Sequence, residues 1–221
     1  MSFYQITAPR LRRLEATWAG TFGRFHGAAP VELGIAHMLA ESNGAADPVV
    51  RNIRTRPVGI MQVPYRVGRR YGYVEEKLKD PLNNIYVWGL ATNDDSKYLH
   101  RTYPSWWLEP NLDFWLAVRL LFVLGHTVFD HLLLTVHESG MVDDSIAGVQ
   151  EWVRTQMRPT QRFGVFNRQT LRRTMDHLDE VNGALVRAHG ASFISTSFNK
   201  DPVAAPGGEE HVYATVTTQL S

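Results

Sequence analysis

The residue best placed to do chemistry in this sequence is Glu41, which stands near the end of an apolar segment. Pro30 suits the first turn of a helix and Asn43-Gly44 supplies a left-handed stop, so residues 30 to 43 are expected to form one helix. Apolar residues cover most of this helix, which predicts that it is buried. A carboxyl group at the margin of a core loses solvation, its pKa rises, and it can act as a general acid. The alternative from this segment alone is a surface glutamate near a helix end.

Further short motifs follow Glu41 along the chain. Glu41-Ser42 is followed by Gly59-Ile60-Met61-Gln62 and then by Asp80-Pro81 with Asn84-Ile85, while Asp47-Pro48 lies between the first two. In this order the motifs resemble the catalytic core of the soluble lytic transglycosylase family, in which an Asn-Pro pair stands near the position of Asp47-Pro48. These are lysozyme-like enzymes that cut the glycan strands of peptidoglycan.

The resemblance implies a mainly α, lysozyme-like helical domain with Glu41 as the catalytic residue. In the family the glutamate protonates the oxygen that leaves between N-acetylmuramic acid and N-acetylglucosamine. It then takes a proton from the C6 hydroxyl of muramic acid, which attacks C1 and closes a 1,6-anhydro ring. The resemblance also implies that Ser42, Met61 and Gln62 shape the substrate-binding cleft, with no cofactor and no metal ion.

The sequence departs from the family pattern in several places. The stretch before Gly59 reads RNIRTRPVGI, where the family has a Ser and a Gly-Ala pair, and Trp88 stands where the family commonly has Gly. The family's Ala-Tyr-Asn-x-Gly element has its best counterpart at Phe122 to Gly125, so Phe122 is the expected substrate-binding aromatic although it lacks the hydroxyl. The resemblance spans roughly residues 25 to 130 and is clearest up to about residue 90.

Two other functions stay open. Most glycosidases use two carboxylates, and the plausible partner between Glu41 and Asp80 is Asp47, which would make the protein a hydrolytic muramidase. The changed stretch before Gly59 and the missing Tyr-Asn pair favour instead a non-catalytic phage structural or ejection protein that keeps a lysozyme-like fold.

The composition of the 221-residue chain is ordinary for a globular protein, with 44% hydrophobic and 20% charged residues. The absence of Cys excludes a disulfide framework and a thiol nucleophile. The first residues lack a continuous apolar run, so no signal peptide is expected, and charged residues interrupt the apolar stretch from Leu112 to Val136, so no membrane span is expected. A wall-cutting enzyme without an export signal suggests a phage protein, carried in the virion or released into the host periplasm.

Charged and aromatic residues suggest how the chain meets a ligand. Eight Lys or Arg against two Glu occur between Arg51 and Lys79, which suits an anionic polymer such as peptidoglycan, although a solvated face is the alternative. Nucleic acid is not expected as a partner, because no signature of a nucleic-acid-binding fold accompanies this charge. Trp106-Trp107 either stack on sugar rings or pack against the helix that follows.

Two further groups of residues are interpreted as structural. His126, His131 and His137 are spaced so that successive side chains point roughly 120° to 140° apart on a helix, which disfavours a metal site. Arg168, Arg172 and Arg173 are interpreted as a solvated helix face.

The hydrophobic pattern is helical nearly throughout. Caps and spacing predict a first helix opened by Pro9 and then helices at 30–43, about 64–71, 81–99, 110–137, 144–157 and 168–189. Residues 1–190 are therefore expected to form the lysozyme-like domain, with the catalytic core at about 25–130 and a helical extension at 140–190. Residues 191–221 contain Pro and Gly breakers before an alternating HVYATVT run, which predicts an extended C-terminal arm that docks to other virion proteins.

Overall fold

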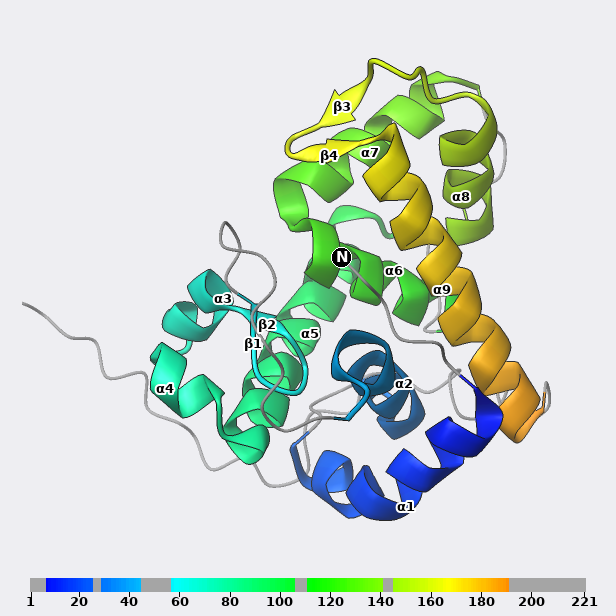
Figure 1. Ribbon diagram of the computed structural model, residues 1–221. Coiled ribbons are helices and arrows are strands. Elements are labelled where there is room, and N and C mark those ends of the chain that lie inside the picture. The colour runs from blue at the N-terminus through cyan, green and yellow to red at the C-terminus, as the bar shows by residue number, and fades with distance from the viewer. Residues whose placement is uncertain (1–6, 26–28, 45–56, 106–110, 141–144, 191–221) are drawn as a thin grey trace, which may run out of the picture.

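Helices dominate the part of the chain that the computed structural model describes, which is residues 7–25, 29–44, 57–105, 111–140 and 145–190 (Figure 1). The mainly α fold predicted from the sequence is therefore confirmed. The arm predicted for residues 191–221 lies outside these ranges. Among the described helices, none has both the length and the apolar character needed to cross a bilayer.

The described residues form seven elements in the first half of the chain and six in the second. The first half contains α1 (Ala8–Phe25), α2 (Val31–Ser42), β1 (Pro57–Val58), β2 (Val63–Pro64), α3 (Tyr65–Arg70), α4 (Glu75–Leu78) and α5 (Pro81–Thr102). The second half contains α6 (Leu112–Leu124), α7 (His126–Glu138), α8 (Ile146–Thr155), β3 (Arg162–Phe163), β4 (Phe166–Asn167) and α9 (Arg168–His189). Strands β1 and β2 form one antiparallel hairpin, and β3 and β4 form another.

Helix α2 lies at the centre of the fold, as its composition predicts. All its residues from Leu33 to Ala40 are buried, and it packs against α1 and α9. Pro30 precedes the first turn, and Asn43 ends the helix with a left-handed backbone (φ 59°) while its N–H bonds to the Leu39 carbonyl oxygen. Both ends of this helix were predicted from the sequence, and its burial fixes the last turn, where Glu41 stands, at the edge of the core.

Helix α5 begins as predicted. The Asp80 side chain caps it by accepting a hydrogen bond of 2.9 Å from the backbone N–H of Asn83, and Pro81 occupies the first turn. The helix continues to Thr102, three residues beyond the predicted end at residue 99. Its first turns lie beside the β1–β2 hairpin and α4, which brings Asn84 against the Gly59 to Gln62 turn.

The prediction of one helix over residues 110–137 is wrong, because α6 and α7 are separate. Gly125 interrupts them with a positive φ (φ 78°, ψ 155°), a backbone conformation outside the helical region that only glycine adopts easily. Apolar residues continue on both sides of Gly125, and this hid the break. The two hairpins were also not predicted, since each has only two residues per strand.

The turn at Gly59 leaves no room for a side chain. A Cβ atom there would lie 2.3 Å from Asn84 Nδ2 and 2.4 Å from the Leu78 carbonyl oxygen, whereas one at Gly72, with a similar φ of 78°, would meet nothing within 4 Å. Gly59→Ala should lower the free energy of unfolding by about 3 kcal/mol or more, since it adds a clash to backbone strain. Gly72→Ala, the matched control, should lose about 1 kcal/mol from strain alone. Urea denaturation measures both, and equal losses would contradict the turn geometry.

Candidate active site

The carboxyl group of Glu41 meets the guanidinium of Arg119 at the border of the core. Arg119 Nη2 donates a hydrogen bond of 3.2 Å to Glu41 Oε1, and the two side chains are 1% and 12% exposed respectively. Arg119 belongs to α6, whose other residues are almost all apolar, so the contact joins α2 to α6. Glu41 Oε2 accepts no hydrogen bond from any described residue.

The electrostatics of this pair favour proton exchange at Glu41. Burial raises the pKa of Glu41, and the nearby Arg119 charge opposes that rise without cancelling it. Burial in turn lowers the pKa of Arg119, and Glu41 opposes that change. The carboxyl group can therefore hold a proton at a higher pH than a solvated glutamate, and Arg119 stabilises the carboxylate once the proton has left.

Two buried histidines complete the surroundings of Arg119. His37 lies one turn before Glu41 on α2, and His177 lies on α9. Burial first and the Arg119 charge second lower the pKa of His37 well below its usual value, and the same causes bring the pKa of His177 to about 2. Both rings are therefore neutral at physiological pH, and the charge facing Glu41 from this cluster belongs to Arg119.

The turn from Gly59 to Gln62 is held by one side chain, that of Asn84. Asn84 Oδ1 accepts a hydrogen bond of 2.7 Å from the Met61 N–H, while Nδ2 donates to the carbonyl oxygens of Val58 (2.9 Å) and Leu78 (2.8 Å). The Met61 carbonyl oxygen lies 3.1 Å from His37 Nε2, which therefore carries the proton and donates. The three motifs that the sequence singled out are in this way brought together, since Asn84 connects the turn to α5 and His37 connects it to α2, the helix of Glu41.

The other predicted substrate-binding residues are placed differently from one another. Ser42 is fully buried, donates to the Met38 carbonyl oxygen (3.1 Å) and accepts from the Gly44 N–H (3.2 Å). Met61 is also fully buried, so both residues support the site from the core and neither side chain reaches solvent. Gln62 is partly exposed and its Nε2 donates to the Gly59 carbonyl oxygen at 2.9 Å, while Phe122 packs edge-on against the His37 ring. The substrate-binding role of these four residues stays a prediction.

Three predicted residues fall outside the described ranges. They are Trp106 and Trp107, the expected sugar-stacking pair, and Asp47, the carboxylate that a hydrolytic mechanism would use. The described portion of the basic stretch lies on α3 and α4, where Arg66, Arg69, Arg70 and Lys77 are exposed. Its role towards an anionic polymer stays a prediction.

The histidines of α7 do not form a ligand set. His126 Nε2 lies 2.8 Å from Asp95 Oδ1, and the His131 ring packs against Phe163. Within the described ranges no group of three His, Cys, Asp or Glu side chains is placed to hold a metal ion.

Arg119 and the two buried histidines were not identified from the sequence as part of the site. A signal was present, because Arg119 is the one cation in the apolar segment LDFWLAVRLLFVL, and a lone charge in a buried helix requires a partner. Which acid supplies that partner depends on how α6 crosses α2, and spacing along the chain does not carry that information.

Comparison of the chain with protein-family models, curated proteins and solved structures gives no match.

Replacing Arg119 should change how stability depends on pH. The folded pKa of Glu41 lies above the ordinary value of 4.5, so its contribution to stability is present below pH 4.5 and is lost as the pH rises through the folded pKa. Arg119→Met removes the charge that opposes this rise, so the loss should extend to higher pH. The lowered pKa values of His37 and His177 destabilise the fold as the pH falls below their ordinary 6.5, and Arg119→Met weakens that effect.

The effect through Glu41 and the effect through the two histidines act in the same direction. The melting temperature of Arg119→Met should therefore fall further below that of the wild type as the pH rises from 4.5, the ordinary pKa of Glu41. Thermal melts across this range measure the difference. Addition of Glu41→Gln to the Arg119→Met variant should remove the part due to Glu41. Parallel curves for wild type and Arg119→Met would contradict the coupling of the two groups.

Proposed function

We propose that this protein is a peptidoglycan lytic transglycosylase that cleaves the bond between N-acetylmuramic acid and N-acetylglucosamine, with Glu41 as general acid and then base. One observation carries the proposal. The Glu41 carboxyl group is largely desolvated, one of its oxygens is held by Arg119, and the other has no partner among the described residues. The order of the motifs around Glu41 supports the choice of a glycan as substrate.

The roles of the two side chains follow from their charges. Glu41, with a pKa raised by burial, gives its proton to the leaving glycosidic oxygen from Oε2. The resulting carboxylate gains the full attraction of Arg119 through Oε1, which favours the transfer. Glu41 then accepts the proton of the muramic acid C6 hydroxyl as that oxygen attacks C1, and the 1,6-anhydro product forms with Glu41 again protonated.

This mechanism needs only one catalytic carboxyl group, because the substrate supplies the nucleophile. A hydrolytic muramidase would need a second carboxylate to activate water or to form a covalent intermediate. Asp47 is the residue proposed for that role, and it lies outside the described residues. The lyase reaction is therefore the proposal, with hydrolysis as the rival that product analysis separates.

A non-catalytic role is favoured by one feature of the same site. A buried Glu–Arg pair that joins two helices is also a structural contact, and Arg119 is 1% exposed. In that case the protein would be a structural or ejection component of a phage particle. As an enzyme, we propose that it acts on the wall from within the virion or after release into the host periplasm.

The catalytic role of Glu41 predicts that Glu41→Gln lowers cleavage of purified peptidoglycan by about 100-fold or more, because the amide cannot donate the proton. Glu41→Gln keeps the shape and the uncharged state that burial favours at this position, so the free energy of unfolding should change little. Turnover is measured by release of soluble muropeptides well below the melting temperature of each variant. Glu32→Gln, a change of the other acid on α2, is the matched control and should keep wild-type activity.

The double variant Glu41→Gln, Arg119→Met separates catalysis from folding. It removes both buried ionisable groups, so no charge is left unpaired in the core and the fold should be kept. It should remain inactive. A folded double variant that cleaves peptidoglycan at the wild-type rate would show that the pair is structural and that Glu41 is not the acid.

The lyase mechanism predicts that Asp47→Asn keeps more than about a tenth of wild-type activity, because no second carboxylate takes part. Mass spectrometry of the products should show muropeptides that end in 1,6-anhydromuramic acid, which are lighter than the hydrolytic products by one water molecule. Reducing ends in place of anhydro ends, together with loss of activity in Asp47→Asn, would support the hydrolytic muramidase instead.

A further inference from the structure

A second feature, unrelated to Glu41, is a pocket of about 450 Å³ beside the β3–β4 hairpin and the first turns of α9. In Figure 1 the hairpin and the start of α9 lie together at one end of the molecule. Four arginines line the pocket, namely Arg162, Arg168, Arg172 and Arg173, and no acidic residue does. The lining therefore concentrates positive charge around one hollow.

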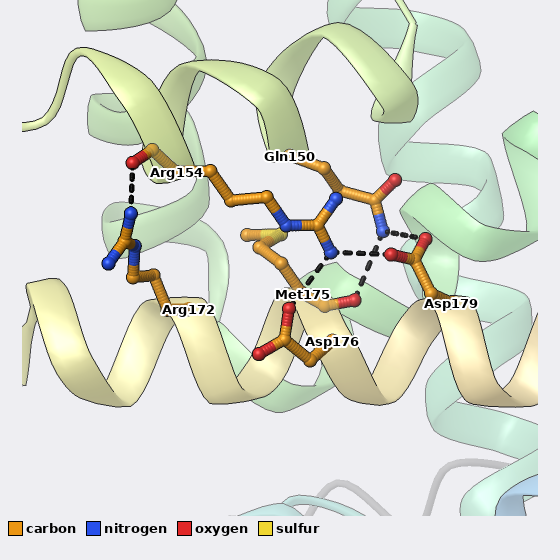
Figure 2. A network of polar contacts seen from close by, with 6 residues as sticks. All are labelled: Gln150, Arg154, Arg172, Met175, Asp176 and Asp179. Carbon is orange, nitrogen blue, oxygen red and sulfur yellow. Dashed lines mark hydrogen bonds and ion pairs between the residues drawn. The ribbon is translucent and has the colours of Figure 1, made fainter.

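The acidic residues close to this pocket are already engaged. Arg154 on α8 forms ion pairs with Asp176, at 2.9 Å, and with Asp179, while Gln150 Nε2 donates to Asp179 Oδ1 at 2.9 Å (Figure 2). These contacts attach α8 to α9. They engage Asp176 and Asp179, the first two carboxylates that follow Arg173 along α9.

The arginines of the pocket are oriented by a neutral group. Arg168 Nη2 donates to the Arg154 carbonyl oxygen at 3.0 Å, and Arg172 Nη2 donates to the same oxygen, as Figure 2 shows for Arg172. A carbonyl oxygen at the end of α8 fixes these side chains but does not neutralise them. In the described part of the chain none of the four arginines forms an ion pair, and Arg168 Nε is buried without a hydrogen-bond partner.

This arrangement is unfavourable for the helix that carries it. Arg168 is the first residue of α9, where the helix dipole is positive, and no acidic residue occupies the first turn. Arg168 and Arg172 are four residues apart, so two like charges face each other on one side of the helix. The like charges oppose helix stability locally, and while Arg168 and Arg172 also tie α9 to the end of α8, Arg162 and Arg173 make no side-chain hydrogen bond among the described residues.

The hairpin and the helix that frame the pocket are held by ring packing and by a helix cap. Phe163 of β3 packs against the His131 ring, with centroids 4.8 Å apart, and against Trp152. Asn167 and Thr170 form a reciprocal capping box at the start of α9, with hydrogen bonds of 2.9 and 2.8 Å. The guanidinium groups are thus presented from an anchored hairpin and a capped helix, which reduces the ordering needed to bind a ligand.

We propose that this pocket binds the phosphate group of a phosphorylated ligand. Guanidinium groups donate paired hydrogen bonds that match phosphate oxygens, and a phosphate monoester offers enough oxygens to engage several of them at once. The charges surround one hollow and do not form an extended stripe, so the ligand is a phosphorylated sugar or a lipid headgroup and not a nucleic acid duplex.

Calorimetric titration of the full-length protein with inorganic pyrophosphate at low salt tests the pocket. Saturable binding is expected for the wild type. Arg162→Gln and Arg173→Gln should each weaken it by about tenfold, as loss of one charged hydrogen-bond partner predicts. These two side chains make no hydrogen bond within the described residues, so the fold should be kept. Arg187→Gln, on the exposed far end of the same helix, is the matched control and should bind like the wild type.

Two further ligands distinguish a phosphorylated sugar from a lipid headgroup as the source of the phosphate. Glucose 6-phosphate represents a phosphorylated sugar, and vesicles of phosphatidylcholine with phosphatidic acid represent a lipid headgroup. Binding of either one that is weakened by Arg173→Gln and not by Arg187→Gln supports the proposal and identifies the source. Absence of saturable pyrophosphate binding, or equal weakening by Arg187→Gln, overturns it. Neither outcome depends on whether Glu41 cleaves glycans.

Discussion

The contact between Glu41 and Arg119 is the constraint on which the centre of this molecule depends. It takes two charges from two different helices, α2 and α6, and places them where water is largely excluded. Such a pair contributes little stability compared with well-packed apolar side chains, because desolvation opposes the attraction. Helices α2 and α6 already bury large apolar faces, so packing alone could hold them together. The chemistry proposed for the Glu41 carboxyl group accounts for a charged pair at this place better than its small contribution to stability does.

The position of that carboxyl group is set by hydrogen bonds that begin on another helix. Asn84 on α5 holds the turn that contains Met61, and the Met61 carbonyl oxygen accepts the proton of His37 on α2. This bond fixes the tautomer of His37, while burial and the Arg119 charge lower its pKa and keep the ring neutral where it packs against Trp88 and Phe122. Glu41 lies one turn further along the same helix. The motifs that are separated in the sequence are thus connected physically, each fixing the orientation of the next.

The sequence predicted most of the helices because their ends carry strong local signals. Pro30 and Asn43 bound α2, and Asn167 and Gly190 bound α9, so these two helices were found nearly to the residue, while Asp80 marked the start of α5 but its end lies three residues beyond the prediction. Where the signal is tertiary, prediction failed. The break at Gly125 is hidden in an apolar run, and the pairing of Arg119 with Glu41 depends on how two helices cross. Glu41 itself was found because its chemistry and its helix end are both visible locally.

Helix α9 connects the two regions for which functions are proposed. Its buried face, which includes Leu171, Met175 and Leu178, packs it into the core, and it contacts α1, α2 and α8. His177 on this helix lies close enough to Arg119 for that charge to lower its pKa, while Arg173 and Arg172 line the pocket only four and five residues earlier. At about 1.5 Å per residue these positions are separated by about 6 to 8 Å along the axis. Because α9 also packs against α2, which carries Glu41, the arginine pocket and the Glu41 site belong to one packed framework.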